Sequence, residues 1–179
     1  GMALLADRPA AGIGADRAPE EALRLYDRAA AAGDETAKKR AAAMRRHAAE
    51  EYAAGVRTTE TAPDEAFRHF PAAAAMGHAE AHCAVGDARI AARGCQKDNR
   101  AAVDAYLRAA ELGSARALYR MGCLYLMNYG VRYDEKLARA CPGGALRGGI
   151  AAAEAKLTEL DNRKKRHTAK KLYAVSCVV

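Results

Sequence analysis

Apolar residues recur along most of this chain at the three- and four-residue spacing of one face of an α-helix. Two stripes show the pattern most clearly, and their members are Ala22, Leu25, Tyr26, Ala29 and Ala30, and then Ala102, Ala105, Tyr106, Ala109 and Ala110. The pattern predicts helices at residues 19–32, 35–54, 63–76, 79–92, 99–112, 115–128 and 134–147, and a last helix running from residue 150 towards residue 171.

The ends of these predicted helices repeat at regular intervals. Gly33, Gly77, Gly113 and Gly149 are 44, 36 and 36 residues apart, and alanine stands four residues before and four residues after each of them. Glycine commonly ends a helix in the left-handed conformation, and an aspartate such as Asp34 readily caps the next one. Turns this short join antiparallel neighbours. The sequence therefore predicts an all-α fold, an α/α superhelix (solenoid) of about three antiparallel helix pairs with capping helices at its ends.

The same intervals divide the chain into segments. Residues 1–18 form an irregular N-terminal segment, and residues 19–149 hold the repeats. Within them a lone helix at 19–32 precedes three units at about 34–77, 78–113 and 114–149. Residues 150–179 supply a C-terminal capping helix and a basic tail. A single helix pair cannot bury both of its faces, so stability must come from stacking neighbouring pairs.

The unit from Ala102 to Val131 resembles the Sel1-like repeat family, a relative of the tetratricopeptide repeats. The matching residues are Tyr106, Ala109, Ala110, Gly113, Ala117, Met121, Gly122, Tyr125, Gly130, Val131 and Asp134. Members of this family mostly act as adaptors in protein complexes, and the resemblance implies that role here.

Other units depart from the family pattern. Arg89 stands where tyrosine is expected, and Cys95 stands where valine is expected. The first unit has Ala41-Ala42 in place of an apolar residue and glycine, and Tyr52, Gly55 and Val56 restore the pattern after an excess of eight residues. Pro142 lies inside the last predicted helix of a pair and should kink or break it.

A stacked array of helix pairs forms a concave surface lined by the first helix of each pair. By register, the predicted partner-binding residues on this surface are Glu80, Asp87, Arg116, Tyr119, Leu126 and Met127, and Cys83, Ile90 and Cys123 share it. Their mixture of types suits a protein or peptide partner. The alternative is that Tyr119 and Leu126 pack against a neighbouring helix.

Composition adds a possible second binding element. The net charge is +7, and six positive charges with no acid among them lie between residues 163 and 171, at Arg163, Lys164, Lys165, Arg166, Lys170 and Lys171. Such a tail can bind nucleic acid or an anionic membrane, or it can simply solubilise the end of the array. No apolar run is long enough for a membrane helix.

Signs of catalysis are weak. His78 and His82 are four residues apart, but Glu80 lies one position too late for the HExxH zinc pattern, and no GxGxxG or P-loop sequence occurs in the context that these motifs need. We therefore expect no metal, no cofactor, no small-molecule substrate and no enzymatic activity. The odd number of cysteines, without a CxxC pair, favours free thiols in a reducing compartment over disulfides, hence a cytoplasmic location. A chain trimmed of a signal peptide would look the same.

Overall fold

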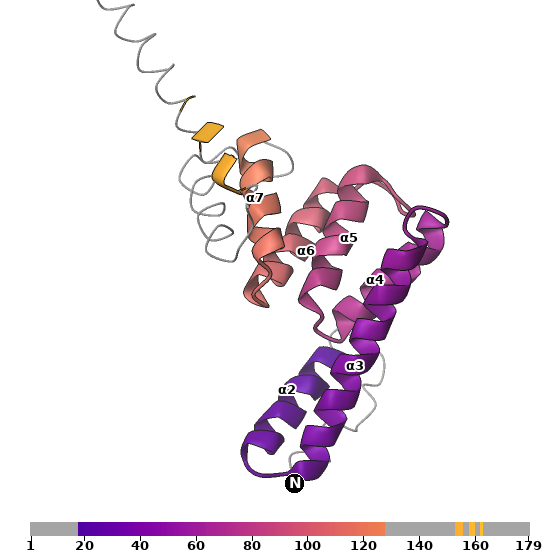
Figure 1. The fold of residues 1–179 in the computed structure, drawn as a ribbon, viewed down its shortest axis with the longest axis vertical. Coiled ribbons are helices and arrows are strands. Elements are labelled where there is room, and N and C mark those ends of the chain that lie inside the picture. The colour runs from indigo at the N-terminus through magenta and orange to yellow at the C-terminus, as the bar shows by residue number, and fades with distance from the viewer. Residues whose placement is uncertain (1–17, 128–152, 156–157, 160–161, 163–179) are drawn as a thin grey trace, which may run out of the picture. The chain divides into compact units, whose positions relative to one another are not determined.

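The computed structural model describes residues 18–127, 153–155, 158–159 and 162. Between residues 18 and 127 it contains helices and no strand (Figure 1): α2 (Ala18–Ala31), α3 (Glu35–Thr58), α4 (Pro63–Ala75), α5 (Ala79–Ala91), α6 (Asn99–Glu111) and α7 (Ala115–Met127). The predicted all-α fold is confirmed. Apart from the end of α3, each of these helices begins and ends within one residue of its predicted range.

The predicted turning points are confirmed by backbone geometry. Gly33, Gly77 and Gly113 have φ angles of +93°, +79° and +92°, in the left-handed region that side chains disfavour. After the first of these turns, Asp34 caps α3, because its carboxylate accepts hydrogen bonds from the backbone N–H groups of residues 36 and 37. Asp98 caps α6 in the same way. Local chemistry at these residues therefore sets where each helix stops and the next begins.

The chain divides into two compact units, residues 1–114 and 115–179. In the first unit, α2 packs against α3, α4 packs against α3 and α5, and α6 packs against α5 (Figure 1). One apolar cluster lies between α2 and α3, and further clusters involve α3, α4 and α5; their buried members are Leu23, Tyr26, Ala29, Ala37 and Ala41, and Ala66, Phe70, Ala73, Ala74, Ala81 and Ala84. Alanine is the commonest residue in this core. Small side chains allow close helix packing, and the few aromatic rings fill the remaining space.

Helix α3 is longer than the sequence predicts. It continues through Gly55 and Val56 to Thr58, and the side chain of Val56 is 50% exposed. The predicted end of this helix at residue 54 is therefore wrong. The reason is tertiary: a Cβ atom on Gly55 would lie 2.6 Å from the ring of Phe70 in α4, so the glycine admits the ring at the helix surface. This packing offsets the ~1 kcal/mol by which glycine disfavours a helix relative to alanine.

A second glycine inside a helix has the same relation to an aromatic ring. Gly86 lies in α5, and a Cβ atom there would be 2.6 Å from the ring of Tyr106 in α6. The ring is 2% exposed. The same arrangement thus occurs in both pairs of the first unit, α3 with α4 and α5 with α6. A glycine on the first helix leaves space that an aromatic ring from the second helix fills.

Several predictions fall on residues that the structure does not describe. These are the irregular segment at 1–17, the helix at 134–147 with Pro142, most of the capping helix, and the basic tail at 163–179. Among the described residues, no helix combines the length and the apolar character needed to span a membrane. In the second unit, α7 buries Ala117, Met121 and Leu124, which lie on one face at helical spacing.

Candidate functional site

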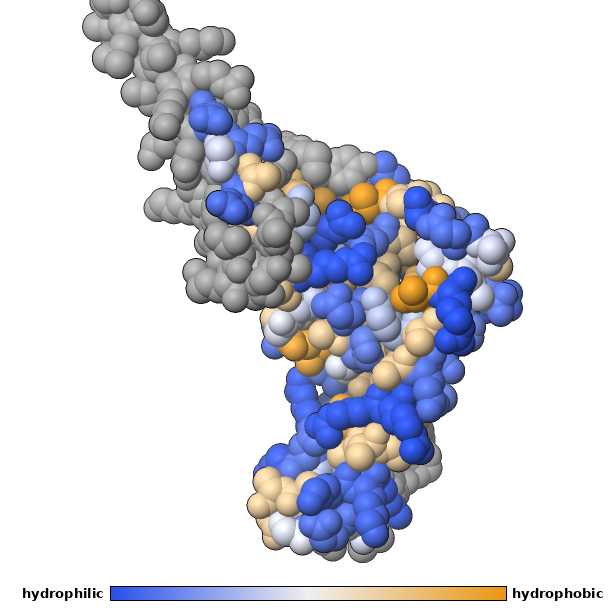
Figure 2. Space-filling view, viewed as in Figure 1, coloured by the Kyte–Doolittle hydropathy of each residue, from blue (hydrophilic) through white to orange (hydrophobic). Residues whose placement is uncertain are grey.

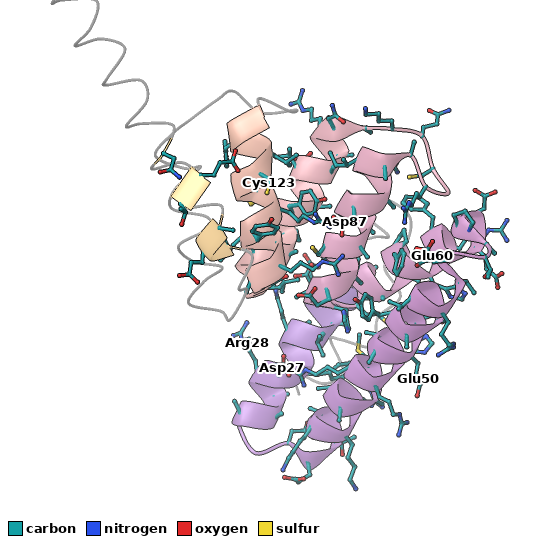
Figure 3. All side chains as sticks on the ribbon, turned by 45° about the horizontal axis from the view of Figure 1, so that its top comes forward. Asp27, Arg28, Glu50, Glu60, Asp87 and Cys123 are labelled. Atoms are coloured by element: carbon teal, nitrogen blue, oxygen red, sulfur yellow. The ribbon has the colours of Figure 1, made fainter. Side chains whose placement is uncertain are left out.

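Two of the predicted partner-binding residues, Glu80 and Asp87, lie two turns apart on α5 and are half-buried. Each carboxylate accepts a hydrogen bond from a hydroxyl group that lies in α6 or directly after it. The Tyr106 hydroxyl of α6 donates to Asp87 over 2.7 Å, and the Ser114 hydroxyl donates to Glu80 over 2.5 Å. Asp87 is labelled on α5 in Figure 3. These two acids therefore have defined orientations, which side-chain packing within the unit maintains.

Cys83 lies between these two acids in the sequence, and its predicted place on the binding surface is wrong. Its side chain is fully buried. The three-residue spacing does put Cys83 on the same face of α5 as Glu80, but α5 packs against both α4 and α6. The middle of that face, with Cys83, therefore belongs to the core. Glu80 and Asp87, at the edges of the face, remain partly exposed. Ile90, near the end of α5, is half-buried.

The remaining predicted residues lie in α7, which belongs to the second unit. Arg116 and Tyr119 are half-buried, as is Cys123, which Figure 3 labels. Leu126 and Met127 end the helix, and their side chains lie outside the part of the chain that the structure describes. Whether these side chains bind a partner stays a prediction.

The structure also contains an ionic cluster that the sequence analysis missed. Glu20, near the start of α2, is 9% exposed, and its carboxylate accepts hydrogen bonds from Arg24 (3.1 Å) and from Arg108 of α6. Arg108 also donates to Glu111 over 2.6 Å. Burial alone would raise the pKa of Glu20, but the two guanidinium groups outweigh burial and hold this pKa below its ordinary value of 4.5. The Glu20–Arg108 ion pair connects residues 88 positions apart.

His82, in the first turns of α5, belongs to the same cluster. Its Nε2 atom is buried, and among the described residues it has no hydrogen-bond partner. Burial lowers the pKa of His82 below 6.5; the negative charge of Glu20 opposes this shift, and the positive charge of Arg108 adds to it. The shift favours the neutral imidazole, and the ring interacts electrostatically with both members of the ion pair that joins α2 to α6.

His78, the other histidine of the predicted pair, has a different structural role. Its Nδ1 atom accepts a hydrogen bond from the backbone N–H of Ala81 over 3.2 Å, so His78 caps α5. Its ring stacks on Tyr52 of α3, with centroids 4.6 Å apart. Burial lowers the pKa of His78, which keeps Nδ1 available as an acceptor. The described residues contain no group of three or more potential metal ligands.

Hydrophobic residues do not gather into a broad patch on the face drawn in Figure 2, where the coloured part of the surface shows separate orange spots among blue residues. The large apolar side chains that are exposed among the described residues are Val56 and Leu107, on α3 and α6. Isolated apolar residues of this kind are normal on a protein surface.

The solved structures that are similar to this chain include two that show its family likeness. A Sel1 repeat protein from Oxalobacter formigenes aligns with a TM-score of 0.60 and 25% identity, over 76% of this chain and 51% of that one. The second, c5321, is a protective antigen present in uropathogenic Escherichia coli strains that displays an SLR fold, and it aligns with a TM-score of 0.58 and 25% identity, over 95% of this chain and 35% of that one. This chain thus spans about half and about a third of their lengths. No family model matches the sequence, and no curated protein matches it. The two structures confirm the predicted solenoid of helix pairs.

Proposed function

Because this chain is a Sel1-like repeat protein, we propose that it binds a protein or peptide partner on the surface formed by the first helix of each pair and that it performs no catalysis. The observation that carries this proposal is the architecture itself. The fold is that of a helical repeat protein-interaction scaffold, in which stacked helix pairs present an extended surface for binding.

The side chains on α5 support the choice of surface. The carboxylates of Glu80 and Asp87 are oriented by the hydroxyls of Ser114 and Tyr106, at 2.5 and 2.7 Å. A side chain that is already ordered loses less conformational entropy when a partner binds. Oriented carboxylates also favour partners that offer matching hydrogen-bond donors.

The proposal also includes residues of α7, which belongs to the second unit. Arg116 and Tyr119 are of the types that protein interfaces favour, because each combines a broad apolar or planar surface with a polar group. Both are half-buried, so substituting them tests binding without removing a core side chain.

Photo-crosslinking tests which surface binds. A photoreactive phenylalanine analogue replaces Tyr119 on α7 in one variant and Leu107 on α6 in the other. Leu107 is 41% exposed and lies on the second helix of its pair, so it is a matched control. In a lysate of the source organism, we expect the Tyr119 variant to crosslink to a discrete partner and the Leu107 variant not to do so. Crosslinking from Leu107 alone would contradict the proposal.

Affinity measurements with the crosslinked partner then test the acids. We expect Asp87→Asn and Glu80→Gln to weaken binding by about 10- to 150-fold each, which corresponds to the ~1.5–3 kcal/mol of a charge-assisted hydrogen bond. Asp104→Asn on α6 is the control, because Asp104 is exposed and lies on the second helix of its pair, outside the proposed surface. Circular dichroism must show that each variant keeps its helices. Equal affinities for all three variants would refute the role of these acids.

The basic residues of the tail provide the alternative. Removing residues 163–179 should leave capture of the protein partner unchanged if the helical surface binds it. If the deletion abolishes capture, together with salt-dependent retention on heparin, the tail is the binding element and the helical surface is not.

A further inference from the structure

Three helices of the first unit meet around the side chain of His82. His82 lies in the first turns of α5, Glu20 lies near the start of α2, and Arg108 lies near the end of α6. The carboxylate of Glu20 is paired with both Arg108 and Arg24. The Nε2 atom of His82 is enclosed and has no partner among the described residues. A buried nitrogen without a hydrogen-bond partner costs free energy. Opening the cluster would let water form that hydrogen bond.

The charges around the imidazole come from every element that surrounds it. Helix α2 contributes Glu20 and its partner Arg24, and α6 contributes Arg108, which is also paired with Glu111. From α5 itself, His78 is close enough to act on His82. The backbone carbonyl of residue 74 in α4 accepts a hydrogen bond from the imidazole, and residues 72–77, at the end of α4 and in the turn after it, carry no titratable side chain.

Burial makes a protonated imidazole unfavourable inside the cluster, and the positive charge of Arg108 adds to this effect, whereas the carboxylate of Glu20 opposes it. A second positive charge beside Arg108 would compete with that residue for the single carboxylate of Glu20. The proton would also place a charge on an enclosed ring, at the cost of desolvation. When the first turns of α2 move away, water reaches the ring, and it can take up a proton as an exposed histidine does.

We propose that the Glu20–His82–Arg108 cluster is an acid-sensitive latch, in which proton uptake by His82 releases the first turns of α2 from α5 and α6. The released segment includes Leu23, whose side chain lies beside the α4–α5 turn at Gly77. Acid would thus uncover apolar surface at this end of the unit. The latch residues Glu20, His82 and Arg108 are not among the residues proposed to bind a partner.

The direction of the pH effect follows from the pKa of His82, which burial lowers below 6.5. The open form binds a proton more readily than the closed form, so the closed form is favoured above pH 6.5 and loses stability as the pH falls below 6.5. When only the open form is protonated, the opening equilibrium is about tenfold larger at pH 5.5 than at pH 7.5. Glu20 remains ionised at both values, because its pKa lies below 4.5.

Hydrogen exchange measured by mass spectrometry on the full chain tests the latch. After correction for the intrinsic pH dependence of exchange, we expect the amides of residues 22–26 in α2 to exchange up to about tenfold faster at pH 5.5 than at pH 7.5. The amides of α6 should change much less. Equal corrected rates in α2 at the two pH values would overturn the proposal.

Two variants isolate His82. His82→Gln cannot take up a proton, and we expect it to abolish the difference between the two pH values. His47→Gln is the matched control, since His47 is 60% exposed on α3, and it should preserve the difference. A His82→Gln chain that still opens in acid like the unaltered chain would overturn the proposal. If that variant fails to fold, an NMR titration of the unaltered chain decides: a His82 pKa below 6.5 supports the latch, and a pKa at or above 6.5 overturns it.

Discussion

Replacing Gly86 with alanine tests the packing of the helix pairs most directly, because two physical effects predict opposite signs. In an exposed helix this substitution stabilises by about 1 kcal/mol, since alanine is the better helix former. In α5, however, the new Cβ atom would lie 2.6, 2.8 and 2.9 Å from three ring atoms of Tyr106. Ordinary contacts between carbon atoms are about 3.5–4.0 Å long, so the ring or the helix must move.

The ring of Tyr106 has little freedom to move. It is 2% exposed, and its hydroxyl is fixed by the 2.7 Å hydrogen bond to Asp87. Overpacking of a well-packed core typically costs about 1–3 kcal/mol, and three close ring contacts favour the upper part of that range. After subtracting the gain of about 1 kcal/mol in helix propensity, we expect Gly86→Ala to destabilise the chain by about 1–2 kcal/mol. For a chain of this size, the midpoint of thermal unfolding should fall by about 2–8 °C.

Urea unfolding followed by circular dichroism at 222 nm measures the change. The control is the same substitution in a Tyr106→Leu background, where the rigid ring is absent. There we expect Gly86→Ala to be neutral or stabilising, so that the two changes are strongly non-additive. Gly55→Ala, opposite Phe70, should repeat the effect in α3. If Gly86→Ala stabilises the chain that keeps Tyr106, the argument that these glycines make room for aromatic rings is refuted.

Three further changes test other parts of the structure. Tyr106→Phe removes the hydrogen bond to Asp87 and should cost about 1.5–3 kcal/mol in urea unfolding, the range for bonds to charged groups; a cost near zero would mean that the bond does not hold the helices together. Gly113→Ala, at φ +92° in open space, should lower stability by about 1–2 kcal/mol, and Gly113→Asn should lower it less, because asparagine tolerates the left-handed region; equal losses would contradict a backbone cause. Glu20→Gln should lower the free energy of unfolding at pH 7, and its difference from the unaltered chain should disappear as the pH falls below 4.5, because the ion pairs of Glu20 stabilise the fold only while the carboxylate is ionised. A difference in stability that does not depend on pH would refute this reasoning.

The sequence was sufficient to predict features that neighbouring residues determine. Glycine at Gly33, Gly77 and Gly113 ends a helix through its own backbone freedom, and Asp34 begins the next helix through its own carboxylate. The spacing of these residues is visible in the sequence, which explains why most helix limits were predicted to within one residue. Gly113 is also one of the residues that carry the family resemblance, which the solved structures confirm.

The features that could not be predicted depend on contacts between distant residues. The length of α3 is set by Phe70, which occupies the space at Gly55, and no local rule favours a helix through a glycine. The Glu20–Arg108 ion pair joins residues 88 positions apart. Cys83 is buried because α5 has neighbours on two sides, whereas periodicity alone identifies only which residues share a face. These contacts could be predicted only if the packing of the helices in three dimensions were already known.

The extended α3 helix has a geometric consequence for the first unit. From α2 to α6, each helix packs against the next one, and the Glu20–Arg108 pair returns from α6 to α2. The chain thus forms a closed circuit, in which α3 is the longest element at 24 residues. Each turn of an α-helix adds about 5.4 Å, so inserting or deleting a turn in α3 would move α2 by more than an ion pair can tolerate. The ion pair between α2 and α6 is therefore a second constraint on α3, and we expect a homologue that keeps this pair to keep the number of turns in α3 as well.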